Sequence, residues 1–507
     1  MVYLLGIDVG TSGIKVILVN QRGKTIVTSS EKYPVHTYHP GWAEQDPEQW
    51  WKSTIKSIRK VLAGTGIDSS KIQGVGLSGQ THGTVAVDKN LLPLRDAIIW
   101  MDRRSIAQVE KLRDKLGEEI NNITGLPISC GFMAPSLLWI QKHEPGLWNK
   151  IHKVLLPKDY IRLKLTGEVA SDVTDAGGTL LLNTHKRQWA KSIIDTLDIP
   201  YNFFPPLYES SQITGYITKK AARVTSLKQG TPIVAGGADQ VMMGIGCSII
   251  KSGEIACSIG TGALLFTCID RPLLKPDRIL HTIPYALAQK WILMGAILSG
   301  GSSFEWFLKQ IISEKATKNL NPALFFSKKI SSISAAKKGL LFLPYLEGER
   351  TPHLDPQARG AFIGLTLRHS QSDLIRAIME GVVFALRDTL EEFKRLEIRP
   401  FHVVSSGGGA KNKLWRQIQA DIFNLPVFTT HVEDASAYGA SLVAAVGVGI
   451  FTTIQDACTK WIKKINEIKP NPENIDTYEK AYKVYSNLYR QLREDFHILS
   501  GMEDRKN

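Results

Sequence analysis

Two short turns, far apart in the chain, carry residue types that bind phosphate. One follows the apolar segment 4–7 and the other follows the apolar segment 255–259. The turn residues are Gly10, Thr11 and Ser12 in the first copy and Gly260, Thr261 and Gly262 in the second. Each pattern predicts two strands joined by a tight turn whose backbone N–H groups suit a phosphate oxygen, although one copy alone also fits a plain hairpin. Their repetition predicts two related domains that face one polyphosphate.

Two aspartates stand where phosphoryl transfer needs carboxylates. Asp8 ends the strand before the first turn and could hold a hydrated Mg²⁺ against phosphate oxygens. Ser258 stands near the matching place of the second copy, so we expect the metal carboxylate from the first half only. Asp239 follows the buried segment 231–235 and could accept the proton of an attacking hydroxyl. An N-cap aspartate is the alternative for Asp239, and the two phosphate turns favour the catalytic role.

Polar side chains at another strand end predict a polyol site. Gln80, Thr81 and His82 follow the predicted strand 73–78, and Trp100 and Asp102 lie just downstream. α/β folds place ligand groups at strand ends, where an amide, an imidazole and a carboxylate could bind several hydroxyls. A structural histidine is the alternative for His82.

A glycine run in the second half predicts a site for a flat group. Gly407, Gly408 and Gly409 follow the predicted strand 401–404 and precede Ala410 and Asn412. Missing side chains allow an adenine ring to approach the backbone closely, although an ordinary strand-to-helix turn remains the alternative.

The elements that must position these residues alternate between strand and helix, which predicts an α/β fold. At 507 residues we expect two domains, 1–247 and 248–507. Asp46 and Pro47 predict a helix start, and Ser302 with Glu305 predicts a capping box. Near the C-terminus, a stripe at helical spacing predicts packing. The stripe consists of Tyr478, Tyr482, Tyr485, Tyr489, Leu492 and Phe496.

Composition narrows the function classes. The net charge is +14, but the basic residues are spread along the chain rather than gathered with aromatics, which argues against nucleic-acid binding. No stretch approaches the length of a membrane helix, and the first residues lead directly into a strand. The five cysteines show no metal spacing, as expected for reduced thiols in a cytoplasmic protein.

The motifs together resemble the FGGY carbohydrate kinases, and the resemblance covers nearly the whole chain. The segment 131–139 resembles the first family signature, and 360–380 resembles the second. Four further segments resemble the members that phosphorylate D-xylulose. They are Trp42–Pro47, Gly79–Gly83, Leu155–Tyr160 and Gly348–His353.

The resemblance implies two duplicated ribonuclease-H-like domains of the actin-like ATPase type with a cleft between them. The N-terminal domain would bind sugar and carry the metal carboxylate Asp8 and the catalytic base Asp239. The C-terminal domain, with its C-terminal helix, would bind the nucleotide at Gly407–Gly409. The implied reaction is ATP- and Mg²⁺-dependent phosphorylation of a ketose at a primary hydroxyl, with D-xylulose as the first candidate.

Three positions depart from the pattern near the expected sugar. Thr81 stands where these kinases typically carry Met, and Met101 and Gln240 each stand where they carry Asn. The alternatives are therefore a kinase for another ketose or polyol and a catalytically inactive sugar-binding relative. An actin- or chaperone-like ATPase shares the hairpins but has no use for the polyol residues. Because two-fold dimers are the commonest soluble oligomers, a homodimer is expected.

Overall fold

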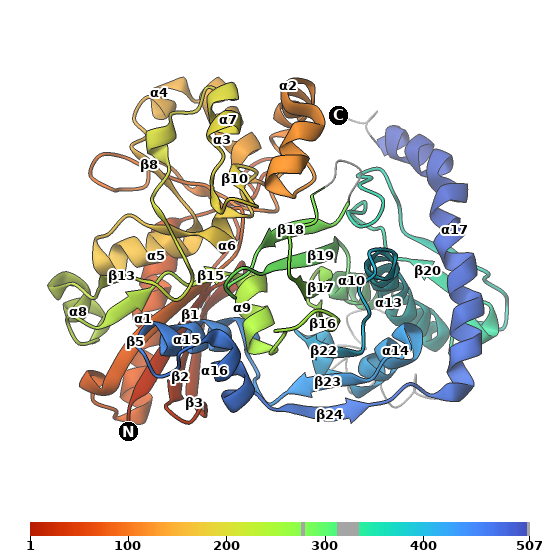
Figure 1. Ribbon diagram of the computed structural model, residues 1–507. Helices are drawn as coiled ribbons and strands as arrows, with labels where there is room; N and C mark the ends of the chain where they lie inside the picture. The colour runs from red at the N-terminus through yellow and green to blue at the C-terminus, as the bar shows by residue number, and fades with distance from the viewer. Residues whose placement is uncertain (275–278, 312–333, 504–507) are drawn as a thin grey trace. The chain divides into compact units, whose positions relative to one another are not determined.

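The computed structural model describes residues 1–274, 279–311 and 334–503 (Figure 1). The chain forms two compact units. Unit 1 comprises Met1–Ile250, Ile269–Ile292 and Val432–Lys463, and unit 2 comprises Lys251–Cys268, Leu293–His431 and Lys464–Asn507. The chain first passes from unit 1 to unit 2 between Ile250 and Lys251, close to the predicted boundary at 247/248. Residues 269–292 and 432–463, which we predicted in the second domain, instead pack in unit 1.

A mixed sheet forms the centre of unit 1, with the strand order β13-β14-β5-β1-β2-β3 and with β15 paired to β5. The strands are β1 (Tyr3–Val9), β2 (Gly13–Asn20), β3 (Thr25–Lys32), β5 (Ile72–Gly79), β13 (Ile213–Tyr216), β14 (Pro232–Val234) and β15 (Gly237–Ala238). β1 and β2 form the predicted hairpin, and β1, β5 and β15 run parallel. In this register Asp8 lies beside Ser78, and Gly237 lies beside Ser78 on the other side.

Two helices cover opposite faces of this sheet. α1 (Pro47–Thr65) begins at the predicted cap, where Asp46 accepts a hydrogen bond from the N–H of Glu48, and its apolar face packs against β2 and β3. α15 (Ala435–Gly447) packs against β1 and β5. It approaches so closely that a Cβ on Gly6 would lie 2.0 Å from Ala437 O. This contact explains why residues 432–463 belong to unit 1.

Smaller elements complete unit 1 around the sheet. The helices are α2 (Ile106–Thr124), α3 (Met133–His143), α4 (Pro145–Trp148), α5 (Pro157–Thr166), α6 (Val173–Ala176), α7 (Lys191–Thr196), α8 (Lys219–Thr225), α9 (Asp239–Gly246) and α16 (Ile454–Trp461). The short strands are β4 (Glu44–Gln45), β6 (Val85–Val87), β7 (Ala97–Ile98), β8 (Lys153–Leu155), β9 (Ser171–Asp172), β10 (Leu182–Asn183), β11 (Gln188–Trp189), β12 (Leu207–Tyr208) and β18 (His281–Pro284).

Unit 2 repeats the plan of the first sheet. Its strands follow the order β19-β17-β16-β22-β23-β24, with β16 and β17 as the second predicted hairpin and β22 parallel to β16. The strands are β16 (Glu254–Ile259), β17 (Ala263–Ile269), β19 (Trp291–Ile297), β20 (Leu341–Leu343), β21 (Ala361–Ile363), β22 (His402–Ser406), β23 (Val427–Thr430) and β24 (Lys464–Ile468). The helices are α10 (Gly301–Gln310), α13 (Gln371–Arg395), α14 (Lys413–Phe423) and α17 (Pro472–Glu503).

The helices of unit 2 correct one prediction and confirm another. The predicted capping box at Ser302 is wrong, because α10 begins after Gly300 and has no side-chain cap. Ser370 and Asp373 form a capping box instead, before α13. The stripe near the C-terminus lies on α17, where Tyr478 and Tyr485 are fully buried, so its packing role is confirmed.

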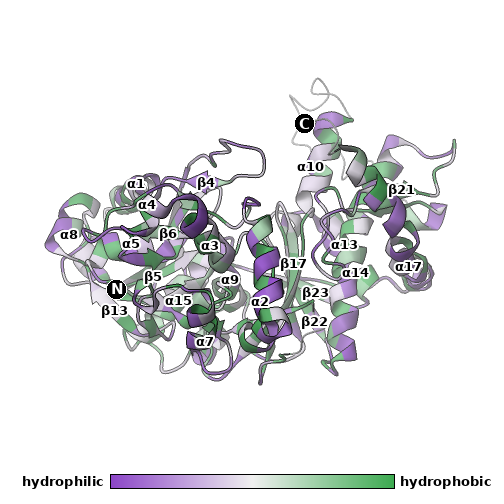
Figure 2. Ribbon diagram, turned by 90° about the horizontal axis from the view of Figure 1, so that it is seen from above, coloured by the Kyte–Doolittle hydropathy of each residue, from purple (hydrophilic) through white to green (hydrophobic). Residues whose placement is uncertain are grey.

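The predicted α/β class with two duplicated sheets is confirmed. Figure 2 shows α2 and α17 with both hydrophilic and hydrophobic residues along their lengths, as expected for helices with one buried face. Within the part of the chain that the structure describes, no helix has the length and apolar character to span a membrane.

Candidate active site

Asp8 lies buried at the carboxyl end of β1. Ser78 on the neighbouring strand β5 donates a hydrogen bond of 2.6 Å to Asp8 Oδ1. Burial raises the pKa of Asp8 to about 6, and the charge of Asp434 adds to the rise. Asp434 is the N-cap of α15 and forms an ion pair of 2.6 Å with Lys15. Asp434 was missed in the sequence because it stands far from the first hairpin.

Asp239 follows the short strand β15 and is the first residue of α9. It is not the N-cap of this helix, because Ala238 occupies that position. Asp239 Oδ1 accepts a hydrogen bond of 2.7 Å from the N–H of Gln240, and the side chain remains partly exposed. Burial raises the pKa of Asp239 to about 7, and the charge of Asp8 contributes to this rise. The two carboxylates, which lie on either side of the end of β5, therefore influence each other's pKa.

Gln80, Thr81 and His82 leave the end of β5 as predicted. Gln80 N donates to Val9 O at 2.9 Å, and Gln240 Nε2 lies 3.5 Å from Thr81 Oγ1. His82 has a φ of 71°, a conformation that is strained for a residue with a side chain and recurs at functional sites. Its Nδ1 hydrogen-bonds to Gly178 O. The structure thus brings Gln240 to the predicted polyol residues.

The first phosphate turn is connected to the polyol residues through Thr11. Thr11 Oγ1 donates to Gln80 Oε1 at 3.1 Å and accepts from Trp100 Nε1 at 2.9 Å. Gln45 Nε2 donates to Thr11 O at 2.7 Å, and Gln45 Oε1 accepts from Gln80 Nε2 at 2.8 Å. Gln45 is 1% exposed and was missed as a site residue, although it lies inside the segment Trp42–Pro47.

The remaining residues of this turn lie as a tight hairpin requires. Gly10 N donates to Gly13 O at 3.2 Å, and Tyr33 Oη donates to Gly10 O. Ser12 is exposed. The turn is thus fixed from inside the unit while its tip is accessible.

The Asp102 carboxylate forms a hydrogen bond and an ion pair with other residues of unit 1. Its Oδ2 accepts from Ala43 N at 2.6 Å, and Arg104 Nη2 lies 2.8 Å from the same oxygen. The Arg104 guanidinium also stacks 3.6 Å above the ring of Trp42. These contacts show that Asp102 holds the loop of Arg104, and its contact with sugar stays a prediction.

A single hydrated Mg²⁺ fits the donors around Asp8. Among the described residues, no group of three or more His, Cys, Asp or Glu side chains could hold a metal ion. Mg²⁺ usually keeps several waters and takes only one or two protein carboxylates besides phosphate oxygens, so it does not need such a group. The raised pKa of Asp8 shows a carboxylate whose negative charge a cation would stabilise.

The second phosphate turn is held by backbone contacts in unit 2. Thr261 O accepts from Gly300 N and from Ser302 N, both at 3.0 Å, and Gly301 N donates to Gly260 O at 2.7 Å. Gly260 N donates to Gly262 O at 2.9 Å. Gly260 and Thr261 are exposed. The turn therefore rests on the start of α10 and presents its tip to solvent.

The glycine run lies beside this turn at the end of β22. A Cβ on Gly407 would lie 2.8 Å from Ile259 O, and a Cβ on Gly409 would lie 2.7 Å from Ile259 Cβ. Gly408 is exposed, and Ala410 lies in the single turn Gly409–Lys411. The Asn412 side chain caps α14, accepting from Leu414 N at 2.9 Å. The structure thus brings together both predicted nucleotide segments of unit 2.

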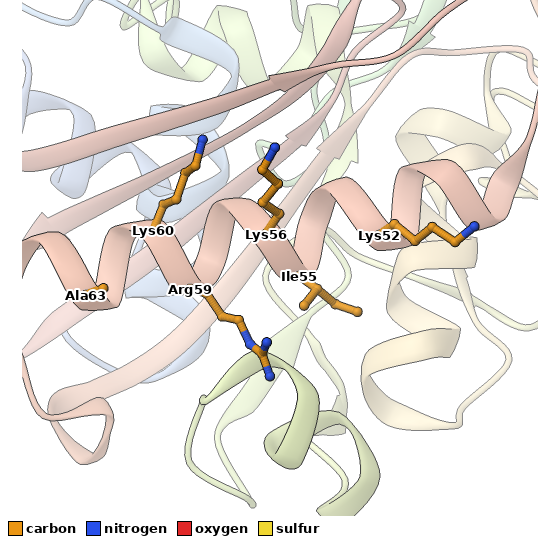
Figure 3. A pocket seen from close by; sticks show the side chains of 6 residues that line it. All are labelled: Lys52, Ile55, Lys56, Arg59, Lys60 and Ala63. Atoms are coloured by element: carbon orange, nitrogen blue, oxygen red, sulfur yellow. The ribbon is translucent and has the colours of Figure 1, made fainter.

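A shallow hollow of about 470 Å³ lies elsewhere, along α1 (Figure 3). It is lined by Lys52, Ile55, Lys56, Arg59, Lys60 and Ala63. Lys56 and Lys60 form ion pairs with Glu31. None of the predicted site residues lines this hollow.

The chain is similar in sequence and in structure to known sugar kinases. Xylulose kinase of Staphylococcus epidermidis is 38% identical over 491 residues, which cover 97% of each chain. A gluconokinase of Bacillus subtilis is 29% identical over 501 residues, covering 97% of each chain. The structure of ligand-bound xylulose kinase from Lactobacillus acidophilus superposes with a TM-score of 0.90 at 26% identity, over 98% of this chain and all of that one.

Family assignment rests on both halves of the chain. Residues 3–246 match the N-terminal domain of the FGGY family of carbohydrate kinases, and residues 255–448 match its C-terminal domain. Because these matches cover most of the sequence and the duplicated sheets carry the two hairpins, the chain belongs to the FGGY family of carbohydrate kinases.

Proposed function

We propose that this protein transfers the γ-phosphate of ATP to a primary hydroxyl of D-xylulose, giving D-xylulose 5-phosphate. The observation that carries the proposal is the convergence of three strand ends in unit 1. Asp8 is the penultimate residue of β1, His82 follows β5 and Asp239 follows β15, and β5 runs parallel to both β1 and β15. The names of the similar kinases support the choice of sugar.

Asp239 is the proposed general base. A pKa of about 7 places it close to the pH at which a kinase works, which favours both the ionised form and proton uptake. The carboxylate would take the proton of the attacking hydroxyl as phosphoryl transfer proceeds in line. Partial exposure of the side chain leaves it open to a substrate.

The proposed sugar contacts come from the end of β5 and from α9. Gln80, Thr81, His82 and Gln240 supply amide, hydroxyl and imidazole groups, which match a row of sugar hydroxyls. Trp100 reaches this group through Thr11, and Asp102 is a further candidate from the same loop. Buried polar groups of this kind discriminate strongly against substrates that lack the matching hydroxyl.

Unit 2 supplies the proposed ATP contacts. The N–H groups of Gly260–Gly262 would bind phosphate oxygens, and Gly407–Gly409 would allow the adenine ring to lie against the backbone. In unit 1, Gly10–Ser12 would add phosphate contacts. Asp8 would hold the Mg²⁺, which when bound neutralises charge on the phosphates.

A sugar panel tests the proposal. Purified protein is incubated with Mg-ATP and D-xylulose, L-xylulose, D-ribulose, glycerol or D-gluconate, and ADP release is measured. We expect the highest kcat/KM with D-xylulose and little ATP hydrolysis without sugar. A higher value with D-gluconate or another member would overturn the choice of D-xylulose. Sugar binding without phosphate transfer would instead identify an inactive relative.

A further inference from the structure

A cluster of charged side chains lies fully buried in unit 1. Lys158 Nζ, in the first turn of α5, lies 2.5 Å from Asp159 Oδ1, 2.7 Å from Asp172 Oδ1 and 3.5 Å from Asp175 Oδ2. All four side chains are 0% exposed. Burying this many ionisable groups costs free energy that hydrophobic packing would not, so the cluster calls for an explanation beyond stability.

Thr174 connects the cluster to the turn that carries Asp239. Asp172 Oδ2 accepts from Thr174 N at 2.7 Å and from Thr174 Oγ1 at 2.6 Å. Because its proton is directed to Asp172, the Thr174 hydroxyl presents a lone pair to Ala238 N, which donates to it at 3.2 Å. Ala238 is the residue before Asp239. A Cβ on Gly237 would lie 2.6 Å from Thr174 Oγ1, so this approach requires glycine.

The same segment contacts His82 at its other end. The turn after α6 includes Gly178, whose N–H donates to Asp175 O at 2.9 Å and whose carbonyl hydrogen-bonds to His82 Nδ1. A Cβ on Gly178 would lie 2.8 Å from His82 Nδ1. Residues 172–178 therefore touch both the turn of the proposed base and a proposed sugar contact.

We propose that residues 172–178, anchored by Lys158, are a positioning element that fixes Asp239 relative to His82. The inference rests on the proposed function. Lys158, Asp172 and Thr174 act through other groups, so they are positioning residues. A general base must reach the attacking hydroxyl within hydrogen-bond distance, and a misplacement of about 1 Å can cost roughly a hundredfold in rate.

The test replaces the Thr174 hydroxyl without changing side-chain shape. In Thr174→Val, Asp172 and Ala238 N lose their common partner, and we expect kcat to fall at least about tenfold while the KM for sugar changes less than about threefold. Thr174→Ser restores the hydroxyl and should recover most of kcat. If the valine variant does not fold, Thr174→Ala removes the same hydroxyl with a smaller side chain and is expected to show the same fall.

Thr225→Val is the matched control. Thr225 is also fully buried in unit 1, and its hydroxyl donates to Ala221 O at 2.8 Å and accepts from Leu227 N at 3.2 Å. We expect this variant to lose similar stability and to keep kcat. Unchanged kcat in Thr174→Val, or an equal fall in Thr225→Val, would overturn the inference alone. A wild-type protein that phosphorylates no sugar of the panel would overturn the proposed function as well.

Discussion

The two hairpins share a backbone plan and differ in what surrounds it. In both sheets the penultimate residue of the first strand lies beside a serine on a parallel neighbour, as Asp8 lies beside Ser78 and Ser258 beside Ser406. In unit 1 the neighbour continues into Gln80, Thr81 and His82. In unit 2 it continues into three glycines. One copy thus presents polar side chains, for which we propose chemistry, and the other presents bare backbone, for which we propose nucleotide binding.

Asp239→Asn should have the largest effect. Removing the proposed base should lower kcat by roughly a thousandfold, with ATP binding largely retained. Phosphate transfer measured by ADP release checks the fall, and Asp195→Asn on the surface of α7 serves as the control. Wild-type kcat in the variant would show that the chemistry of unit 1 does not depend on this carboxylate.

The same variant should change the pH dependence of stability. Because the folded-state pKa of about 7 lies above the ordinary value for Asp, ionisation of Asp239 disfavours the folded state as pH rises from about 4 through 7. Asp239→Asn should therefore be more stable than wild type at pH 8, by about 4 kcal/mol, and close to it near pH 4. Urea unfolding at both pH values measures the difference. A constant difference would contradict the assigned pKa.

Asp8→Asn should have the second-largest effect on turnover. Loss of the carboxylate charge should lower kcat by roughly a hundredfold and raise the Mg²⁺ concentration needed for half-maximal turnover. The corresponding change in the second hairpin, Ser258→Ala, should leave the Mg²⁺ dependence unchanged. Equal Mg²⁺ dependence in Asp8→Asn and wild type would remove the functional difference between the two hairpins.

Thr11→Val and Thr261→Val compare the two turns directly. Thr11→Val leaves Gln80 Oε1 and Trp100 Nε1 without their shared hydroxyl, so the free energy of unfolding should fall by about 2 kcal/mol. Thr261 is exposed, and its variant should change stability by less than about 0.5 kcal/mol. Urea unfolding of both variants gives the numbers. Equal losses would mean that the turns are held alike.

Gly408→Ala should have the smallest effect. Its backbone is helical (φ −62°, ψ −38°) and a Cβ would meet only Ile259 O at 3.7 Å, so the fold should tolerate alanine. If ATP lies against this backbone, the KM for ATP should rise about tenfold, or about 1.4 kcal/mol, with kcat little changed. Gly64→Ala, where a Cβ meets nothing within 4 Å, is the control. An unchanged KM would place the adenine elsewhere.

The sequence predicted the features that local patterns encode. An apolar run before Asp8 or before Gly260 predicts a strand and turn regardless of the rest of the chain, and both hairpins were found. The roles proposed for these residues remain predictions. Gln45 was missed because its importance comes from contacts with Thr11 and Gln80, which are distant in sequence. Tertiary partners of this kind leave no periodic signal.

Long-range packing also explains the other differences. The placement of residues 432–463 in unit 1 depends on small residues of α15 meeting Gly6 and Gly76, and no local pattern joins these segments. The capping box was predicted at Ser302 because the spacing of Ser and Glu is correct there. In the structure, the backbone N–H groups at the start of α10, including that of Ser302, instead donate to carbonyl groups of the second turn.

The late arrival of α15 bears on how the protein is made. A ribosome completes β1 and β5 long before it reaches the helix that covers Gly6 and Gly76. Until then, the nascent first half holds an uncovered sheet face, the kind of surface that invites misassembly and chaperone binding. The speed at which the ribosome translates the second half of the chain therefore determines how long this face of the unit 1 sheet remains exposed.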